Sequence, residues 1–454
     1  MRLRPRTPIL LPASATLAVA IALVAAPVRS DPDAAGHRVT GSDPAPSPTE
    51  PRPTEPPVAH ARADVEEAPT PVPPDPGYPP DRTFSPLPPS SVAHLRRLRA
   101  LHPGLSDRAF MKVGDSTVES RAYLTCLAEE LDLGEREALA TTLSHFRSER
   151  ARGADPFRRR SEASAVGWSA RHVLSGRRSA LVRELTAMRP RFALVSFGTN
   201  DVEDRAPHRF AHRMWRIVDR LLERGVIPVL STAGGRADDR ESDRWIPRYA
   251  LITRGLAQGR GVPLLDMNRE WERLPRRGLA RDGVHPNTFV RRGRPRPCDF
   301  GEEGLTYGHN LRNLRTLEML DRLRRTVVAG EPAPDPEPRA LDGEGTADDP
   351  LRLPGLPWAQ LGPLPVGVPE RVHRIALARD ETLWVGAFAR HARFLELMLR
   401  RADGPGPPVR VRSHGVVELS AGRWDVVVKN VPRGEQEQYL LVLRTETLPP
   451  SPYP

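Results

Sequence analysis

Between about residues 93 and 330, short apolar runs alternate with amphipathic helical patterns, and no other feature limits the fold as strongly. An order of strand, helix, strand indicates an α/β domain with a parallel sheet, since each crossover helix must cover a face of that sheet. The clearest expected strands are residues 110–113, 192–197, 226–230 and 262–265, and the clearest expected helices are residues 210–222 and 315–328. Ligands bind beyond the carboxyl ends of such strands. We therefore expect the functional site where these apolar runs end.

A serine follows the first expected strand directly, in the sequence Val113-Gly114-Asp115-Ser116-Thr117. A serine hydroxyl is a weak nucleophile until a base lies within hydrogen-bond reach, and an imidazole suits that task near neutral pH. His285 is the candidate base, and Asp282 stands three residues earlier, where it can orient the imidazole. We expect activity to rise as His285 loses its proton.

Attack on an ester carbonyl builds negative charge on oxygen, which fixed hydrogen-bond donors must stabilise. The candidate donors are the backbone N–H groups of Ser116 and Gly167 and the side-chain amide of Asn200, which follows the second expected strand. Glycine at position 167 lets a backbone N–H approach the substrate without a side chain in the way. Loss of one such donor typically costs roughly 3 to 4 kcal/mol of transition-state stabilisation.

The order of these residues resembles the SGNH hydrolase family, also called GDSL-type esterases and lipases. That family is named for a Ser, Gly, Asn and His in four blocks, and this chain has Ser116, Gly167, Asn200 and His285 in that order. The resemblance implies a flavodoxin-like three-layer α/β/α domain, a catalytic triad and an oxyanion hole, and it requires no metal or cofactor. The implied triad is Ser116, Asp282 and His285, the implied oxyanion hole is Ser116, Gly167 and Asn200, and the implied supporting residues are Asp115, Gly198 and Asp201. Thr117 stands where the family usually has leucine.

Each block also has a purely structural interpretation. Gly-Asp-Ser is a common turn, Gly-Thr-Asn-Asp can be an Asx turn that ends a strand, and Asp282 with His285 can be a surface ion pair. A rival nucleophile, Ser169, lacks the second glycine of a nucleophile elbow, and we expect it to begin a helix.

Two further clusters point to solvent-facing structure. His208 and His212 stand four residues apart but lack the glutamate of a zinc-binding helix, so we expect a solvated helix face. The acidic residues Asp238, Asp239, Glu241 and Asp243 lack calcium-loop spacing, so we expect a solvated loop.

The amino-terminal residues 1–30 read as a secretory signal peptide, with early arginines followed by an apolar stretch; an uncleaved anchor is the alternative. The only cysteines are Cys126 and Cys298. An even number of cysteines in an exported chain favours one disulfide, with two buried thiols as the alternative.

Proline-rich composition marks residues 31–92 as an extended spacer and residues 331–344 as a second linker. Short strand patterns in residues 345–446 predict a small jelly-roll-like β-sandwich, followed by a tail at 447–454. The runs at 345–350 and 419–426 resemble the pre-peptidase C-terminal domains of secreted bacterial peptidases. Such a domain can contact the cell envelope, aid secretion or only stabilise the enzyme.

These features together predict a secreted or cell-surface serine esterase that hydrolyses O-acyl esters through an acyl-serine intermediate. Acetyl or other short-chain esters, including those of polysaccharides, are the preferred substrates. A lipase or lysophospholipase of the same family is the closest competitor, and a non-catalytic envelope-binding protein with an esterase-like fold is the alternative from another class. The basic segment 287–304 is expected to shape selectivity. Nearly all of the positive charge behind the net charge of +11 is arginine and is spread along the chain, so no nucleic-acid partner is expected; attraction to an anionic cell envelope or an acidic polysaccharide is the alternative.

Overall fold

The computed structural model describes residues 82–365, 367–390, 395–429 and 437–446. The chain divides into two units, residues 1–68 and 69–454, and every described residue lies in the second. The predicted signal peptide, most of the predicted spacer and the carboxyl-terminal tail lie outside the described residues. No helix in the described part of the chain is long and apolar enough to cross a bilayer.

The α/β domain begins earlier than predicted, so the assignment of residues 83–92 to the spacer is wrong. The carbonyl of Thr83 accepts a hydrogen bond from the N–H of Asp266 at 2.7 Å, and the N–H of Ser85 donates to the carbonyl of Leu264 at 3.0 Å. Helix α1 (Pro89–Leu101) then buries Val92 and Leu95. Proline fits the first turn of a helix, where no N–H is needed, so the proline-rich composition concealed a helix start.

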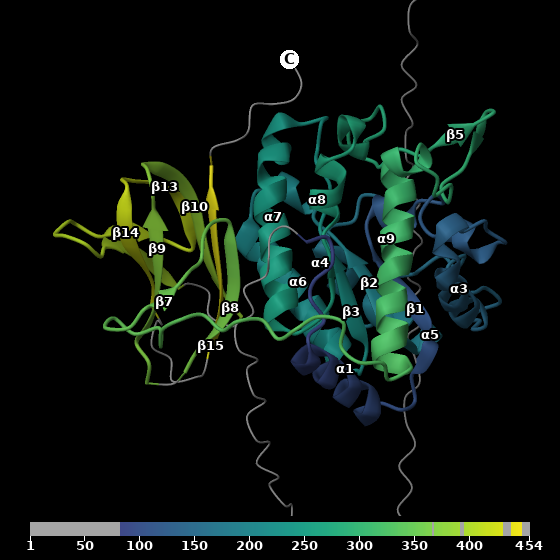
Figure 1. Cartoon of the computed structure of the whole chain (residues 1–454), viewed down its shortest axis with the longest axis horizontal. Coiled ribbons are helices and arrows are strands. Elements are labelled where there is room, and N and C mark those ends of the chain that lie inside the picture. The colour runs from purple at the N-terminus through teal and green to yellow at the C-terminus, as the bar shows by residue number, and fades with distance from the viewer. Residues whose placement is uncertain (1–81, 366, 391–394, 430–436, 447–454) are drawn as a thin grey trace, which may run out of the picture. The chain divides into compact units, whose positions relative to one another are not determined.

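Four parallel strands form the central sheet in the order β1 (Ser106–Gly114), β2 (Pro190–Ser196), β3 (Ile227–Ser231) and β4 (Leu264–Leu265) (Figure 1). They coincide with the four expected strands. An isolated parallel bridge also joins Gly114 to Ser164. The chain therefore returns beside the end of β1 shortly before it reaches Gly167.

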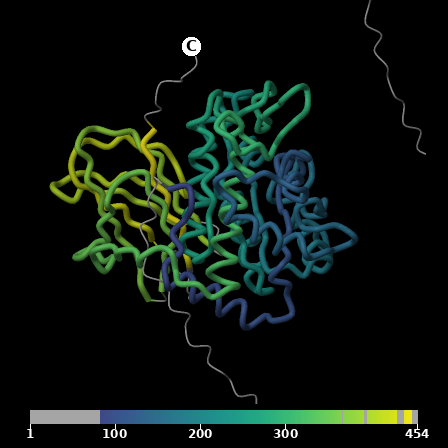
Figure 2. Tube along the Cα trace, turned by 45° about the vertical axis from the view of Figure 1, so that its right-hand side comes forward, coloured from purple at the N-terminus to yellow at the C-terminus, as the bar shows by residue number. Residues whose placement is uncertain are grey.

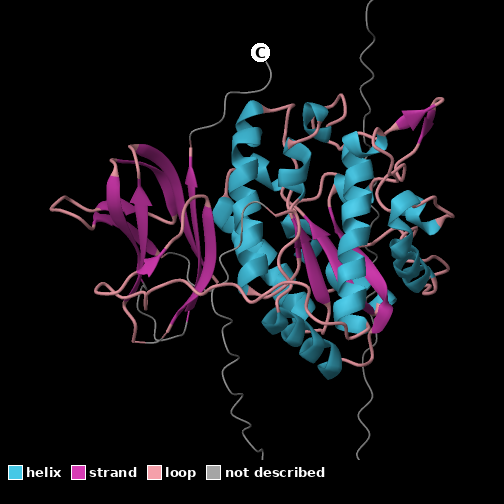
Figure 3. Ribbon diagram, in the orientation of Figure 1, coloured by secondary structure: helices cyan, strands magenta, loops and turns pink. Residues whose placement is uncertain are grey.

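Helices cover both faces of this sheet, as a three-layer α/β/α domain requires (Figure 3). In β2, Ala193 and Val195 pack with one layer of helices, and Phe192 and Leu194 pack with the other. The first layer contains α4 (Ala170–Leu174), α5 (Ala180–Met188), α6 (Pro207–Leu222) and α7 (Arg240–Gly259), and the second contains α1, α3 (Ala140–Arg147) and α9 (Gly308–Leu323). A π-helical turn, Arg324–Val328, continues α9. The remaining short helices are α2 (Ser116–Glu119), α8 (Met267–Glu272) and the 3₁₀ turns Thr125–Ala128, Gly134–Leu139, Asp201–Asp204, Pro275–Gly278 and Gly304–Thr306.

The carboxyl-terminal region is a sandwich of two sheets, which are antiparallel apart from one parallel pair, β7 with β9. One sheet has the order β12 (Val409–Val411), β11 (Glu396–Arg401), β14 (Gly422–Lys429), β9 (Glu370–Leu377), β7 (Leu351–Arg352), and the other β13 (His414–Leu419), β10 (Glu381–Ala389), β15 (Glu437–Thr445), β8 (Trp358–Leu364). The sequence predicts strands at residues 382–388, 394–399, 424–429 and 438–444, which β10, β11, β14 and β15 match; residue 394 lies outside the described residues. Strand β8 was not predicted because Gly362 and Pro363 interrupt it, and neither residue favours a strand.

The four-stranded sheet of the sandwich is buried on both faces. In β15, Leu440 and Val442 pack with the α6 and α7 layer, whereas Leu441 and Leu443 pack inside the sandwich. Helix α7 lies beside β8 and β15 in both Figure 1 and Figure 2. Burial on both faces accounts for the unbroken apolar run at 439–443. The sandwich therefore shares a continuous core with the α/β domain.

Two glycines of α7 allow this close approach. A side-chain carbon built at Gly255 would lie 2.4 Å from the Leu440 Cδ1 atom, and one at Gly259 would lie 2.3 Å from the Leu361 Cβ atom. We expect Gly255→Leu to lower the free energy of unfolding by about 1 to 3 kcal/mol, because the added atoms overpack this boundary. Urea denaturation measures the loss. Gly404→Leu is the matched control, since nothing lies within 4 Å of that glycine's absent side chain. Equal losses in the two variants would contradict the prediction.

Candidate active site

The strand-to-helix turn after β1 presents Ser116. Gly114 ends the strand where a side-chain carbon would lie 2.5 Å from the carbonyl oxygen of Ser196, so only glycine fits. The carboxylate of Asp115 caps α2 by accepting hydrogen bonds from the Thr117 N–H at 2.9 Å and the Thr117 hydroxyl at 2.8 Å. The threonine that departs from the family pattern thus donates two hydrogen bonds to one oxygen of a buried carboxylate. Ser116 is left as the first residue of the helix.

The structure joins Ser116, His285 and Asp282 in one chain of hydrogen bonds. The Ser116 Oγ atom lies 2.8 Å from His285 Nε2, and His285 Nδ1 lies 2.8 Å from Asp282 Oδ2. The other oxygen of Asp282 accepts the backbone N–H groups of Val284 and His285, both at 3.0 Å. With Nδ1 donating to Asp282, the Nε2 atom is free to accept the serine proton. This is the geometry that general-base activation of a serine needs.

The environment of Asp282 keeps its carboxylate ionised. Burial acts to raise the pKa of Asp282, but hydrogen bonds from the N–H groups of Val284 and His285 and from the His285 ring outweigh it, so the pKa lies below its ordinary value. The loop itself is fixed by Gly283, whose φ is +72° and whose carbonyl accepts the N–H of Ala237 at 2.8 Å. A side-chain carbon at Gly283 would lie 2.7 Å from the backbone nitrogen of Asp238.

Gly167 and Asn200 lie in segments that bind each other. The side-chain amide of Asn200 donates to the carbonyl of Trp168 at 2.8 Å, and the carboxylate of Asp201 accepts the N–H of Ala170 at 3.0 Å. An amide nitrogen has two hydrogens, so the Asn200 amide keeps a second donor. At Gly167, φ is +74° and the space that a side chain would fill is open. Gly198, at φ +130°, approaches Ala233 so closely that a side-chain carbon would lie 2.9 Å from its Cβ atom.

Asp201 titrates unusually because of its burial. Burial raises the pKa of Asp201 to about 7, and the charge of Asp115 adds to the rise, while the hydrogen bond from Ala170 and the charge of Arg213 oppose it. In the fold, Asp201 therefore keeps a proton at pH values where the unfolded chain has lost it. Its contribution to stability is present below about pH 4 and is lost as the pH rises through about 7.

A neutral amide at position 201 should remove this pH dependence. Asp201→Asn keeps an oxygen to accept the N–H of Ala170 but does not ionise. At pH 8 we expect the free energy of unfolding of the variant to exceed that of the wild type by on the order of 1 to 3 kcal/mol. We expect this difference to vanish near pH 5. Urea titrations at the two pH values measure it. A difference that is the same at both pH values would show that ionisation of Asp201 is not the cause.

Three other sequence interpretations have structural outcomes. Ser169 occupies the N-cap position of α4 and its N–H donates to His172 Nδ1 at 2.9 Å, as expected of a residue that begins a helix. As predicted, His208 and His212 are exposed on α6, although the ring of His208 also stacks on the ring of His414 in the sandwich, with centroids 6.0 Å apart. Across the part of the chain that the structure describes, no group of three His, Cys, Asp or Glu side chains could hold a metal ion.

The acidic stretch at 238–243 is a loop only in part, because Asp238 and Asp239 precede α7 whereas Glu241 and Asp243 lie in its first turn. Asp239 caps α7, and the carboxylates of Asp238 and Asp243 accept hydrogen bonds from Arg236, at 2.7 Å from its Nε and its backbone N respectively. The buried guanidinium of Arg236 then donates to the carbonyl of Thr199 at 2.6 Å. The acidic residues thus hold an arginine under the turn that carries Asn200. Sequence reasoning missed Arg236 because no motif contains it.

A second missed arginine lies behind the nucleophile. Arg312 of α9 is fully buried, donates to the carbonyl of Thr117 at 2.9 Å and stacks 4.0 Å above the ring of Tyr123. Its neighbour His309 is also buried, and burial, aided by the charges of Arg312 and His285, lowers the pKa of His309 to about 3. His309 therefore stays neutral beside the reactive histidine. Neither residue has a spacing that would mark it in the sequence.

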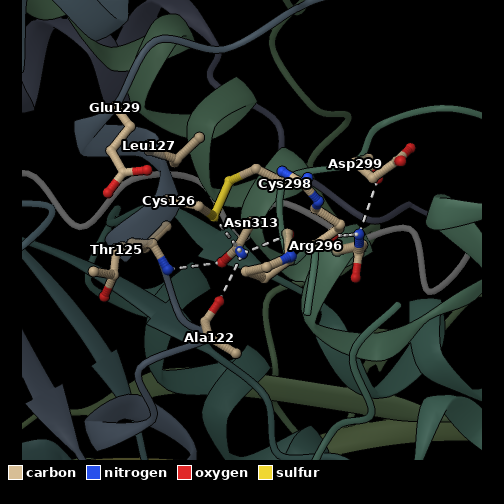
Figure 4. The surroundings of a disulfide bond; sticks show 12 residues. Ala122, Thr125, Cys126, Leu127, Glu129, Arg296, Cys298, Asp299 and Asn313 are labelled. Carbon is tan, nitrogen blue, oxygen red and sulfur yellow. Dashed lines mark hydrogen bonds between the residues drawn. A yellow bond between two sulfur atoms is a disulfide. The ribbon is translucent and has the colours of Figure 1, made fainter. Parts of the chain in front are cut away.

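Cys126 and Cys298 form a disulfide, and Figure 4 shows its surroundings. The amide nitrogen of Asn313 lies beneath it and donates to the carbonyls of Ala122 at 2.8 Å and Pro297 at 2.9 Å. The bond and this asparagine together connect the segment after α2 to the segment after His285.

Residues 113–289 match the GDSL-like lipase/acylhydrolase family. This span contains Ser116, Asp282 and His285, which the structure places in contact. The α/β domain belongs to the GDSL hydrolases. The chain is accordingly a serine ester hydrolase with a carboxyl-terminal β-sandwich.

Solved structures resemble parts of this GDSL hydrolase. An acetylxylan esterase from Geobacillus stearothermophilus is 15% identical, with a TM-score of 0.32, over 48% of this chain and 95% of that one. A putative lipolytic protein of the G-D-S-L family from Desulfitobacterium hafniense is 11% identical, with a TM-score of 0.30, over 47% and 99% of the two chains. The pre-peptidase C-terminal domain of a collagenase from Bacillus anthracis is 13% identical, with a TM-score of 0.18, over 20% and 92%. A comparison with curated proteins gives no match.

Proposed function

We propose that this GDSL hydrolase cleaves short-chain O-acyl esters through an acyl-serine intermediate. The hydroxyl oxygen of Ser116 attacks the ester carbonyl while its proton passes to Nε2 of His285, and Asp282 stabilises the resulting imidazolium. His285 then gives the proton to the departing alcohol. Water, activated by the same imidazole, releases the acid and regenerates Ser116.

The unbroken hydrogen-bonded chain from Ser116 through His285 to Asp282 is the observation that carries this proposal. A binding protein has no need of a serine hydroxyl aligned with an imidazole and a carboxylate. The backbone N–H groups of Ser116 and Gly167 and the second amide hydrogen of Asn200 are the proposed donors to the oxyanion.

A groove formed by the segments that follow α2 and His285 supports short acyl groups, although Ser116, Gly167, Asn200 and His285 do not line it. The groove has a volume of about 1590 Å³ and lies between residues 126–136 and 291–305. Charged side chains from both segments line most of it, whereas a long acyl chain binds best against apolar side chains. We therefore favour acetyl and similar esters of hydrophilic alcohols, such as carbohydrates.

A series of p-nitrophenyl esters from acetate to palmitate tests the proposal. We expect kcat/KM to be highest for acetate or butyrate and to fall steadily for longer chains. An active-site fluorophosphonate should label the wild type. A maximum at palmitate would favour a lipase instead, and absence of both hydrolysis and labelling would favour a non-catalytic protein.

We also propose that the enzyme is exported. The signal-peptide pattern at residues 1–30 supports this, as does the disulfide between Cys126 and Cys298, because such bonds persist mainly in oxidising compartments. Fractionation of cells that produce the full chain tests it. Recovery only from the reducing cytoplasm, with both thiols free, would contradict it.

A further inference from the structure

The segment that follows His285 forms a small, strongly basic hairpin. Strands β5 (Val290–Arg291) and β6 (Arg294–Pro295) pair through a two-residue turn, and the hairpin stands out from the molecule beside α9 (Figures 1 and 3). We call residues 290–296 the arginine hairpin. Its four arginines, Arg291, Arg292, Arg294 and Arg296, are exposed, and it contains no acidic residue. Within the described residues, no ion pair joins any of the four to a carboxylate.

The hairpin tolerates arrangements that are unfavourable for stability. Arg291 and Arg294 are direct cross-strand partners, and like charges in that position repel. Arg292 has a φ of 53° at the first turn position, where Asn, Asp or Gly would be less strained. A polyanionic partner would offset the repulsion between Arg291 and Arg294.

The hairpin is also held in a fixed position relative to the active site. The carboxamide of Asn310, in the first turn of α9, accepts the N–H of Phe289 at 3.1 Å and donates to the carbonyl of Arg296 at 2.7 Å. The preceding residue, His309, donates its backbone N–H to the carbonyl of Asn287 at 2.9 Å. Val290 is five positions after His285, so at most roughly 18 Å of chain lies between them. A substrate chain bound at Ser116 can therefore extend to the hairpin.

Across the groove stands a wall of opposite charge. We call Glu129, Glu130, Asp132 and Glu135 the acidic lip. These residues line the groove together with arginines of the hairpin, and Arg136, Asp299 and Glu302 line it as well. Carboxylates on the lip accept hydrogen bonds from hydroxyl groups, while arginines bind carboxylates through paired N–H donors. A ligand with both groups along its length matches the two walls. An apolar acyl chain would match neither wall.

We propose that the groove between the arginine hairpin and the acidic lip binds an acidic polysaccharide, whose carboxylates contact the arginines and whose hydroxyls contact the lip. This inference rests on the proposed function for its role: it directs the esterase to acyl groups on polyuronate chains. The arginines also distinguish such chains from neutral acetylated polysaccharides.

Binding is measured in the full-length Ser116→Ala protein, so that no turnover occurs and the result does not depend on catalysis. We expect polygalacturonate to bind, with an affinity that falls as salt is raised. Adding Arg291→Gln and Arg294→Gln together should weaken binding about threefold to tenfold. The matched control adds Arg97→Gln and Arg412→Gln, two exposed arginines without a described ion pair, and should bind as the parent does. Arg97 lies in α1, which precedes the amino end of β1, and Arg412 lies in the sandwich, between β12 and β13.

Equal binding by the hairpin variant and the control variant would overturn the proposal. Tighter binding to phosphatidylglycerol vesicles than to polygalacturonate would overturn it in favour of a membrane surface, and equal binding to neutral xylan would remove the role of charge. In the active enzyme, the hairpin variant should lose more kcat/KM on acetylated polygalacturonate than on p-nitrophenyl acetate. If polygalacturonate binds as expected but no ester is hydrolysed, the proposed function fails and the binding site stands.

Discussion

Replacing Ser116 with alanine is expected to lower kcat on p-nitrophenyl acetate by roughly 10⁴- to 10⁶-fold, because the variant has no oxygen to form the acyl intermediate. The Ser116 Oγ atom is the one that lies 2.8 Å from His285 Nε2. Labelling by a fluorophosphonate should disappear with the same change. Steady-state assays at saturating substrate and mass spectrometry of the labelled peptide measure the two effects.

The matched control is Ser169→Ala, which removes the rival serine. Ser169 caps α4, so this variant should keep its catalytic rate and lose only about 1 kcal/mol of stability. Residual labelling of Ser116→Ala, or loss of labelling in Ser169→Ala, would assign the nucleophile to Ser169 instead. If both outcomes are observed, Ser116 has no role in the chemistry.

The sequence predicts the catalytic core well because chemistry limits its residues. A serine after a strand, an Asp-x-x-His turn and an Asn after the next strand each need a specific functional group at a specific edge of a parallel sheet. The structure brings Ser116, Asp282 and His285 together at that edge, and it brings the segments of Gly167 and Asn200 into contact. The cysteines 172 residues apart also pair, although the sequence alone left free thiols open.

The groups that support the site escaped prediction because many side chains can perform the same task. Arg236 donates to the carbonyl of Thr199 and Arg312 to that of Thr117, and a backbone carbonyl accepts from any donor. No spacing rule follows from such contacts. In a chain so rich in arginine, Arg236 and Arg312 cannot be distinguished from the exposed arginines without the fold.

The sandwich shows the same limit at the level of packing. Its four-stranded sheet can pack closely against α7 because two residues of that helix, Gly255 and Gly259, have no side chain. In the sequence, glycine is instead a residue that disfavours a helix. Strand β9 carries His373, which is fully buried and hydrogen-bonded to the hydroxyl of Tyr439 at 2.7 Å. Polar residues that are satisfied by partners far along the chain break the apolar alternation on which strand prediction depends.

Asn200→Ala is expected to lower kcat by about 10²- to 10³-fold while KM changes little, because the oxyanion forms only after the substrate is bound. One hydrogen of the Asn200 amide is engaged by the carbonyl of Trp168 at 2.8 Å, and the other is the proposed donor to the oxyanion. The rate of fluorophosphonate labelling should fall in parallel, since the phosphoryl oxygen occupies the same position. Single-turnover assays separate the chemical step from binding.

Loss of the contact with Trp168 is the competing explanation, and Asp201→Ala controls for it. Asp201 anchors the same segment by accepting the N–H of Ala170 at 3.0 Å, and its alanine variant removes this anchor but leaves the Asn200 amide in place, so its kcat should stay within a few-fold of the wild type. If Asn200→Ala instead raises KM alone, the amide binds the ground state and the transition state equally. In that case the Asn200 side chain does not stabilise the transition state more than the bound substrate. The backbone donors at Ser116 and Gly167 must then stabilise the oxyanion without it.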